Sequence, residues 1–304
     1  MIVLSNGHSF EYIVASGAMG FDGSGWLWER PLVRLGFIKP ELFTTVLKTL
    51  TWYPRNGNLR WWKPWECIKS IPGGSVNKVS LTNKGIRHWI NEIAPNIDFK
   101  KFPIVGSVFG DVGKIVELTR EFNAFDFVAI EVNGSCPNVD DSSEIQQAES
   151  IIRCVRMAKS VSRHPVIVKV SVSQNYLAIA RGLVGVAEAV SINSVPWEVA
   201  FHSGEETPLW RLMNKTGGGG GGVSGVPAQK ENWKAVKALA MQGALPVIAP
   251  SIMEFSDMDY VRSIGADAVS FGAIHLPTKG KPWTLFTNPC KPTRYVELER
   301  RGER

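Results

Sequence analysis

Short apolar runs alternate with amphipathic stretches along this chain, and that alternation limits its fold more than any other feature. Eight runs of strand length recur, at residues 12–16, 42–47, 103–108, 127–132, 166–170, 187–192, 246–249 and 268–271. Between most of them, apolar residues at three- and four-residue spacing predict helices over residues 112–122, 144–161, 175–183, 231–241 and 255–264. Eight such units in 304 residues predict an α/β fold, a (β/α)8 TIM barrel of parallel strands.

The composition agrees with one large domain. With 304 residues, 44% hydrophobic and 20% charged, the chain is able to bury a large core, and we expect a single barrel domain over residues 1–304. No apolar run approaches the roughly 18 residues that cross a bilayer, and the first residues lack a basic leader, so we expect a cytoplasmic protein. The net charge of +6 forms no basic stripe, which argues against nucleic-acid binding and suits small anionic ligands.

The four cysteines lie far apart and form no C-x-x-C pair: Cys67, Cys136, Cys154 and Cys290. This spacing argues against a metal site, against an iron–sulfur cluster held by this chain alone, and against disulfides. Cys136 differs from the others because it lies in the segment IEVNGSCPNV, on a polar turn directly after a predicted strand. It is either a buried cysteine that packs as a small apolar side chain or a reactive thiol at a functional loop.

Polar or small residues follow several predicted strands at the same end. In a TIM barrel the carboxyl ends of the strands meet on one face, where active sites lie. A single lysine or asparagine there is usually a solvated loop residue, but recurrence after five strands favours a binding site. The residues are Gly17, Lys48, Thr49, Asn133, Cys136, Lys169, Asn193 and Ser194.

Three long connections interrupt the barrel pattern, and we expect long loop insertions at the carboxyl face. Residues 51–83 carry four tryptophans and form either an interaction surface or core and lid packing. Residues 195–230 contain six consecutive glycines, which form either a flexible linker or a loop that approaches a phosphate or a flat ring closely. The four prolines after Leu276 predict that no long helix closes the chain.

The motifs together resemble those of the dihydroorotate dehydrogenases, in order along most of the chain. The most specific part combines NGSCPN with Lys48, Asn77, Lys169 and the segment INS. The matching segments are ASGAMGF from Ala15, TVLKTLT from Thr45, NKVSLTNKG from Asn77, GSVFGD from Gly106, IEVNGSCPNV from Ile130, PVIVKVS from Pro165, SINS from Ser191 and TGGGGGGVSG from Thr216.

The resemblance implies oxidation of dihydroorotate to orotate, a step of pyrimidine biosynthesis, with flavin mononucleotide (FMN) as cofactor. Such an oxidation needs a base that removes a proton beside a carbonyl while a hydride leaves the neighbouring carbon. By resemblance, Cys136 is that base. The substrate-binding positions that match the family are Lys48, Asn77, Asn133, Asn138, Asn193 and Ser194.

The same resemblance assigns the flavin contacts. Lys48 is expected between substrate and flavin, where its charge balances the substrate carboxylate and the reduced ring. Lys169 is expected to contact the flavin ring or its ribityl chain, and small residues match positions where a larger side chain would block the ring. The full set is Ala15, Ser16, Gly17, Lys48, Thr49, Asn133, Lys169, Ile192, Gly222, Ser251, Gly272 and Ala273.

Two departures from the family pattern affect the loops. The family commonly holds the cofactor phosphate with backbone amides of two glycines after the seventh strand, where this chain has Pro250 and Ser251. Because proline has no amide hydrogen, we expect the Ser251 hydroxyl to replace one donor, beside Gly272 and Ala273 after the eighth strand. Ser80 stands where the substrate loop of the family usually has glycine.

The resemblance also implies partners. The chain has neither the N-terminal extension nor the serine base of the membrane-associated branch, so the soluble cysteine type, class 1, is expected. Its electrons pass either to fumarate or to a partner subunit that carries FAD and an iron–sulfur cluster and reduces NAD. Residues 214–225 resemble the partner-dependent type more. A homodimer is expected as well.

Two other hypotheses stay open at this point. One is a flavin enzyme of another pyrimidine, of the uracil or dihydrouracil type, whose ring lacks the carboxylate that Lys48 would bind. The other is a barrel without catalysis that serves as a binding scaffold, which Pro250 and Ser251 and the unusual C-terminus favour. Choice of substrate tests the first, and absence of flavin binding tests the second.

Overall fold

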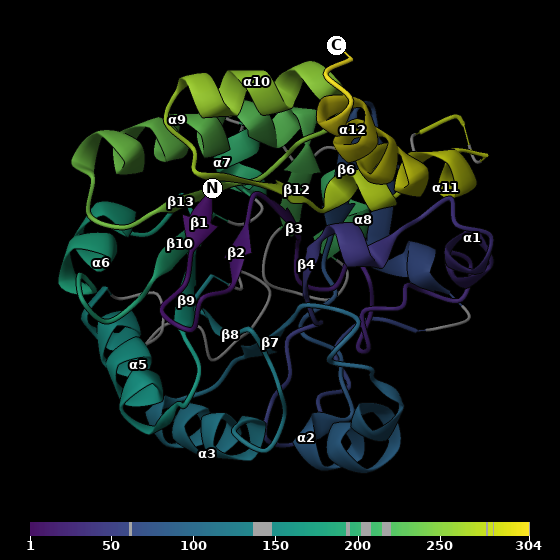
Figure 1. Ribbon diagram of the computed structural model, residues 1–304. Coiled ribbons are helices and arrows are strands. Elements are labelled where there is room, and N and C mark those ends of the chain that lie inside the picture. The colour runs from purple at the N-terminus through teal and green to yellow at the C-terminus, as the bar shows by residue number, and fades with distance from the viewer. Residues whose placement is uncertain are drawn as a thin grey trace.

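A closed barrel of eight parallel strands forms the centre of the computed structural model (Figure 1). The strands are β3 Tyr12–Val14, β4 Thr44–Val46, β7 Ile104–Val108, β8 Ala129–Asn133, β9 Val166–Val170, β10 Ala189–Ile192, β13 Val247–Ala249 and β14 Ala268–Phe271. All eight predicted strands and the TIM-barrel fold are confirmed. The structure describes residues 1–60, 63–135, 148–192, 195–201, 208–214, 220–277, 279–281 and 283–303.

The barrel strands are buried on both faces, which explains their near-continuous apolar sequences. No residue of β7, β8 or β9 is exposed. Parallel pairing sets Val105 opposite Ala129 and Val132 opposite Val168. One side chain from every strand contributes to a layer inside the barrel: Ile13, Val46, Val105, Ala129, Ile167, Ala189, Ile248 and Ala268.

Helices cover the outside of the barrel. The five long ones near the predicted positions are α3 Val112–Phe122, α5 Ala148–Val161, α6 Tyr176–Gly182, α9 Val226–Gln242 and α10 Phe255–Ser263. The Asp111 side chain caps α3 by accepting from the Lys114 amide. The α9 helix begins before the predicted residue 231 because Pro227 fits its first turn, where no amide hydrogen is needed. Residues 144–147 of the predicted helix lie outside the described residues.

Shorter elements connect these units. Four are short helices, α1 Arg30–Arg34, α2 Gly85–His88, α7 Trp197–Ala200 and α8 Pro208–Asn214. Five are 3₁₀ turns, η1 Pro40–Leu42, η2 Pro64–Glu66, η4 Ala94–Asn96, η5 Ala273–His275 and η6 Asn288–Cys290, and η3 Trp89–Ile93 is a π-helical turn.

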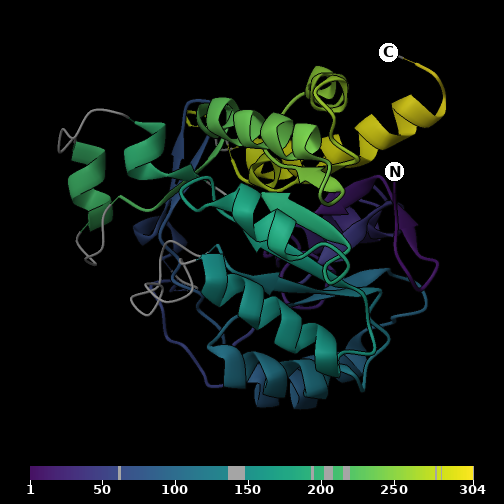
Figure 2. The ribbon, with the colours of Figure 1, turned by 90° about the vertical axis from the view of Figure 1, so that its left-hand side faces the viewer.

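The two ends of the barrel are closed differently (Figure 2). At the amino end, the hairpin of β1 Ile2–Val3 and β2 Ser9–Phe10 packs Ile2, Leu4 and Phe10 onto the inner layer of strand residues. At the other end lies a small antiparallel sheet formed by the long connections: β5 Ile68–Ile71, β6 Gly74–Asn77, β11 Val195–Pro196 and β12 Gly222–Gly225. The predicted insertions at the carboxyl face therefore form an ordered sheet in their described parts.

The small sheet has two different faces, because side chains alternate along a strand. Val76 and Val223 point to one face, where they pack with Trp197 and Met213. Ser75 and Asn77 point to the other, which faces the barrel cavity. The sheet thus carries polar groups to the end of the barrel where the strands finish.

The prediction that no long helix closes the chain is wrong. After the short helix α11 Thr284–Thr287, helix α12 Lys291–Arg300 runs for ten residues and buries Tyr295 and Val296. Pro292 lies in its first turn, where proline is compatible with a helix. Within the described ranges, no helix combines the length and apolar character needed to cross a membrane.

Candidate active site

A cavity of about 290 Å³ lies at the carboxyl ends of the barrel strands, between the barrel and the small sheet. Its wall contains residues that follow or end six strands, together with residues of β6 and β12. Twelve residues assigned by the sequence line it: Ala15, Ser16, Gly17, Lys48, Thr49, Asn77, Asn133, Lys169, Ile192, Ser251, Gly272 and Ala273. The sequence thus predicted residues that the fold brings together from positions as far apart as 15 and 273.

Only one of the five remaining assigned residues is among those that the structure describes. Gly222 does not line the cavity, and its carbonyl instead accepts a hydrogen bond of 3.5 Å from Asn77 Nδ2 on the neighbouring strand. Four others lie outside the described residues, so their roles stay predictions: Cys136, Asn138, Asn193 and Ser194.

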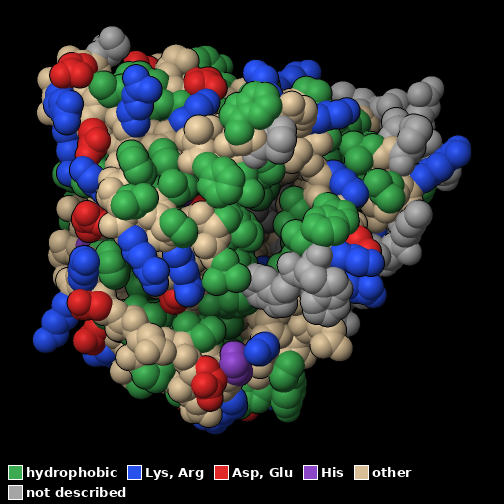
Figure 3. All heavy atoms as spheres, turned by 90° about the vertical axis from the view of Figure 1, so that its right-hand side faces the viewer, with side chains coloured by type: hydrophobic (Ala, Val, Ile, Leu, Met, Phe, Trp, Pro, Cys, Tyr) green, Lys and Arg blue, Asp and Glu red, His purple; other side chains and the backbone are tan. Residues whose placement is uncertain are grey.

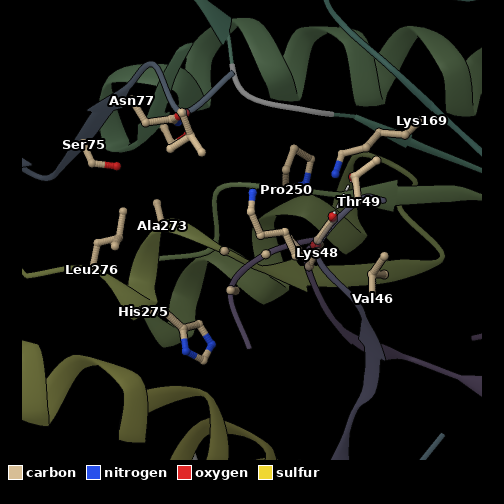
Figure 4. A pocket seen from close by; sticks show the side chains of 18 of the residues that line it. Val46, Lys48, Thr49, Ser75, Asn77, Lys169, Pro250, Ala273, His275 and Leu276 are labelled. Carbon is tan, nitrogen blue, oxygen red and sulfur yellow. Dashed lines mark hydrogen bonds between the residues drawn. The ribbon is translucent and has the colours of Figure 1, made fainter. Parts of the chain in front are cut away.

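Two lysine side chains point into the cavity (Figure 4). Lys48 follows β4, and its ammonium group lies 5.9 Å from the centre of the Phe21 ring. Lys169 lies in β9 and is buried, with its ammonium group 3.5 Å from Glu131 Oε1. A ligand in this cavity therefore meets the positive charges of two lysines, and that of Lys169 is buried beside a carboxylate.

Buried hydrogen bonds connect the strand ends below the two lysines. Glu131 Oε1 accepts from Ser107 Oγ at 2.9 Å, and Ser107 Oγ lies 2.9 Å from Thr49 Oγ1. Thr49 Oγ1 also accepts from Asn133 Nδ2 at 2.9 Å and lies 3.0 Å from Ser16 Oγ. This network fixes side chains from four strands relative to one another, because each polar group has a partner away from water.

Hydrogen bonds connect the turn of Gly134 and Ser135, which precedes Cys136 in the sequence, to side chains at the end of β8 and after β9. Asn133 Oδ1 accepts from both the amide and the hydroxyl of Ser135, at 3.2 and 3.0 Å. Gln174 Nε2 donates to the carbonyl of Gly134 at 2.6 Å. These hydrogen bonds therefore hold the turn at the end of β8, next to the cavity that Asn133 lines.

Unpaired polar atoms gather at this cavity. Among the described residues, five buried side-chain atoms have no hydrogen-bond partner, and four of them belong to lining residues: Trp28 Nε1, Ser75 Oγ, Asn232 Oδ1 and His275 Nε2. A buried polar group without a partner costs about 1–3 kcal/mol. Their concentration here indicates a polar ligand that pairs with at least some of them.

His275 differs from the other three because its imidazole points away from the neighbouring lining residues Ala273 and Leu276 (Figure 4). Its Nδ1 lies 2.9 Å from Oε1 of Glu29, whose side chain is wholly buried. The other oxygen of Glu29 accepts from the Trp26 amide at 2.9 Å. This buried pair joins the turn after β14 to the loop after β3, so it positions two walls of the cavity.

The walls after β3 and β14 need small residues. A side chain on Gly272 would place its Cβ 3.2 Å from Cβ of Ala15, a tight contact that one of the two walls would have to relieve by a small shift. Gly17 has a φ of +86°, a conformation that favours glycine. These positions leave room for a flat group against the backbone.

One described thiol lies near the site. Burial raises the pKa of the Cys67 thiol to about 11, although the nearby positive charge of Lys48 opposes the shift. Cys67 is therefore a protonated thiol near pH 7, and its environment does not suit a base.

Comparison with known proteins gives the family. The family model for dihydroorotate dehydrogenase matches residues 12–273, which contain all eight barrel strands. The chain belongs to the dihydroorotate dehydrogenase family.

Related proteins of this family support the match along nearly the whole chain. The "dihydroorotate dehydrogenase B (NAD(+)), catalytic subunit" of Caldicellulosiruptor saccharolyticus is 27% identical and covers 95% of this chain and 90% of its own length. The protein of the same name from Desulforudis audaxviator is 30% identical, and the match covers 88% of this chain and 83% of that protein. A crystal structure of dihydroorotate dehydrogenase from Eimeria tenella with ferulenol has a TM-score of 0.67 at 15% identity, over 96% of this chain and 82% of that one, which supports the fold.

Several lining residues of this family member were missed by the sequence analysis. Glu131 was available as a signal, since a carboxylate within a run of strand residues is unusual unless it is paired. Ser107, which does not line the cavity but is hydrogen-bonded to the lining residues Thr49 and Glu131, was visible as a small polar residue in a predicted strand. Trp26, Trp28 and Asn232 gave no local signal, because they lie within a loop or a helix and reach the cavity only through the fold.

Proposed function

We propose that this chain oxidises dihydroorotate to orotate in pyrimidine biosynthesis and that its flavin is FMN. Membership of the dihydroorotate dehydrogenase family, across residues 12–273, supports the reaction. The single observation that carries the proposal further is the cavity itself, which collects twelve of the assigned residues at the carboxyl face of the barrel. Family membership does not favour the uracil-type enzyme or the scaffold.

The residues present fit a flavin. Gly17, Gly272 and Ala15 form a wall without large side chains, which would hold a flat ring close to the backbone. The unpaired Ser75 Oγ and Asn232 Oδ1 provide hydrogen-bonding groups that a flavin nucleotide is able to use. When bound, the flavin supplies the acceptor for the hydride that leaves the substrate.

The chain's own residues supply the remaining functions. Cys136 Sγ removes the proton from the substrate carbon beside the carbonyl, because the thiolate form is a base. Lys48 balances the negative charge of the substrate carboxylate. Asn77 and Asn133 offer both amide donors and amide acceptors to the ring of the substrate. Asn138, Asn193 and Ser194 complete the proposed set.

The proposed flavin contacts divide between ring and phosphate. Lys169 and the hydroxyls of Ser16 and Thr49 are placed on the ring side in this proposal, because they belong to the network below the cavity. The backbone of Gly272 and Ala273 and the side chain of Ser251 are assigned to the phosphate. We infer further that residues 1–304 act as one flavin-binding domain.

A partner that takes electrons from the flavin is part of the proposal. Relatives are named as NAD(+)-dependent catalytic subunits, which supports a partner subunit with FAD and an iron–sulfur cluster over fumarate as acceptor. Exposed apolar side chains adjoin lining residues: Leu27 lies between Trp26 and Trp28 and is 75% exposed, and Trp65 follows Pro64 and is 59% exposed. Figure 3 shows apolar side chains around a hollow on one face of the molecule. Such a surface suits a protein partner.

The expected homodimer and the cytoplasmic location stay predictions. Light scattering after size-exclusion chromatography, with and without the partner subunit, measures the first. Localisation of a tagged chain by cell fractionation measures the second.

An absorbance spectrum before and after anaerobic addition of dihydroorotate tests the proposed function. We expect a yellow protein whose flavin band is bleached by dihydroorotate and not by dihydrouracil, with FMN released on denaturation. Bleaching by dihydrouracil alone would support the uracil-type enzyme. A protein that binds no flavin after reconstitution would support the scaffold. Re-oxidation by fumarate without a partner would contradict the partner-dependent type.

A further inference from the structure

We propose that the side-chain amide of Asn232, paired with the Ser251 hydroxyl, binds the phosphate of the flavin nucleotide. The inference deepens the proposed function and rests on flavin binding at the same cavity. It assigns a donor at the loop where Pro250 has no amide hydrogen to offer.

Asn232 reaches the cavity from the second turn of helix α9. Its side chain is 1% exposed, and Nδ2 donates to Ser251 Oγ at 3.0 Å. Its Oδ1 has no partner among the described residues, although it is buried at the cavity wall. A structural asparagine of this burial normally has both ends of its amide paired. The unpaired end therefore points to a ligand.

The Pro250–Ser251 loop is held in place by the same helix. Gln229 Nε2 donates to the Ser251 carbonyl at 3.0 Å, and Trp233 Nε1 donates to the Pro250 carbonyl at 3.0 Å. Ser251 has a φ of +68°, in the left-handed region that glycine adopts more easily. In this conformation the Ser251 hydroxyl oxygen accepts the hydrogen bond from Asn232 Nδ2, which gives the strained residue a specific role.

The chemistry of the pair allows it to bind an anion. A serine hydroxyl both donates and accepts, so it pairs equally well with either end of the asparagine amide. When the amide is turned by 180°, Oδ1 accepts from Ser251 Oγ and the NH2 group faces the cavity. A phosphate oxygen accepts hydrogen bonds, so a bound phosphate favours this orientation and removes the unpaired acceptor. The Ser251 hydroxyl then donates to Asn232, and it acts on the phosphate through the Asn232 amide.

The neighbouring backbone also suits a phosphate. Gly225 precedes the 17-residue helix α9, and both Ser224 and Gly225 line the cavity. The amino end of a long helix carries a partial positive charge. At α9 the Val226 amide donates to the Gly73 carbonyl and Pro227 has no amide hydrogen, so this end contributes its charge and not those two amides. Gly272 and Ala273 line the same cavity at the start of η5. The Asn232 amide and these backbone amides together replace the missing glycine pair.

Comparison of FMN with riboflavin isolates the phosphate, because riboflavin has the same ring and ribityl chain. The dissociation constants of both are measured on flavin-free protein by quenching of flavin fluorescence. We expect Asn232→Leu to weaken FMN binding about 10- to 100-fold and riboflavin binding less than about twofold, the range for one hydrogen bond to a charged group. Asn232→Asp, which keeps the shape and adds a negative charge, should weaken FMN at least as much.

A matched control lies on the same helix. Gln242 is half-buried and also has a buried amide oxygen without a partner, but it does not line the cavity. Gln242→Leu should leave the ratio of the two dissociation constants unchanged. Equal losses for FMN and riboflavin in both Asn232 variants, or no loss for either, would overturn the proposal while the proposed function stands. Failure of the unsubstituted protein to bind either flavin would contradict the proposed function and this site with it.

Discussion

Glu131 and Lys169 are opposite charges buried side by side at the strand ends, with side chains that are only 3% and 6% exposed. Removing one partner of such a pair leaves the other charge buried without compensation, which costs about 3–5 kcal/mol. We expect Glu131→Gln to lower the free energy of unfolding by about that amount, as measured by urea denaturation. The double variant Glu131→Gln with Lys169→Met should recover part of the loss. Equal stability of the single variant and the unsubstituted protein would show that the pair contributes little.

At the same scale, the proposed base predicts a kinetic effect that is separate from binding. Cys136→Ala should slow reduction of the bound flavin by dihydroorotate about 10²- to 10⁴-fold, the usual contribution of a general base, and should retain the flavin. Stopped-flow absorbance under anaerobic conditions measures the rate. Cys290→Ser is the control, because Cys290 does not line the cavity. Unchanged reduction kinetics in Cys136→Ala would remove Cys136 from the role of base.

Thiol labelling tests whether another cysteine takes that role. Burial raises the pKa of Cys67 and of Cys154 to about 11, so near pH 7.5 both remain almost wholly protonated in the folded protein. Because the thiolate is the reactive form, iodoacetamide at pH 7.5 should modify neither, and modification of both should increase as the pH approaches 11. Mass spectrometry of the digested protein measures the extent at each residue. Rapid labelling of Cys67 at pH 7.5 would contradict the shift.

At the scale of elements, the contact between β7 and α3 depends on a glycine. A Cβ on Gly106 would lie 2.5 Å from Phe122 Cε2 and 3.1 Å from Phe127 Cε2, so the strand and helix would have to separate. Gly106→Ala should destabilise the protein by about 1–3 kcal/mol, the cost of overpacking a core, as measured by urea denaturation. The control is Gly113→Ala at the start of α3, where the change should stay within about 1 kcal/mol because alanine favours the helix. A neutral Gly106→Ala would mean that the contact is loose.

Elements were predictable where the local pattern determines them. The barrel strands were found because burial on both faces leaves an apolar run of strand length, as in Val166–Val170. Helix α12 was missed because Pro292 was taken as a breaker, although proline fits a first turn. The small sheet was missed because its strands pair across long separations, such as Gly74 with Gly225, and no local pattern reports such a pairing.

In the candidate site, too, some residues were predictable from the local sequence and others were not. Residues at strand ends, such as Lys48 and Lys169, were predictable because the barrel brings all strand ends to one face. Trp28 and Asn232 were not, because a loop and a helix carry them to the cavity and their sequence neighbours give no sign of it. Glu131 could have been noticed as a carboxylate within a strand, but its partners Ser107 and Lys169 could not, because the partners of a buried charge depend on the packed structure.

At the scale of the whole molecule, the closure of the amino end of the barrel links stability to pH. Glu188 accepts from the amide and the hydroxyl of Ser5, both at 2.6 Å, and lies 3.3 Å from the ammonium group of Lys159. Burial raises the pKa of Glu188, but the hydrogen bonds from Ser5 and the charge of Lys159 outweigh it, so the pKa is lowered from its usual value of 4.5. The unfolded chain therefore binds the proton more tightly than the folded protein does.

This difference between the folded and unfolded pKa of Glu188 determines how the stability changes with pH. A carboxyl group whose pKa is lowered on folding stabilises the protein above the unfolded pKa, near 4.5, and the contribution is lost as the pH falls through the lower folded pKa. Glu188→Gln should reduce the free energy of unfolding by about 1 kcal/mol at pH 7, and the difference between variant and unsubstituted protein should shrink below pH 4.5. Urea denaturation across pH 3 to 8 measures it, with Glu149→Gln on exposed α5 surface as the control. A difference that stays constant across this range would mean that Glu188 acts through packing and not through its charge.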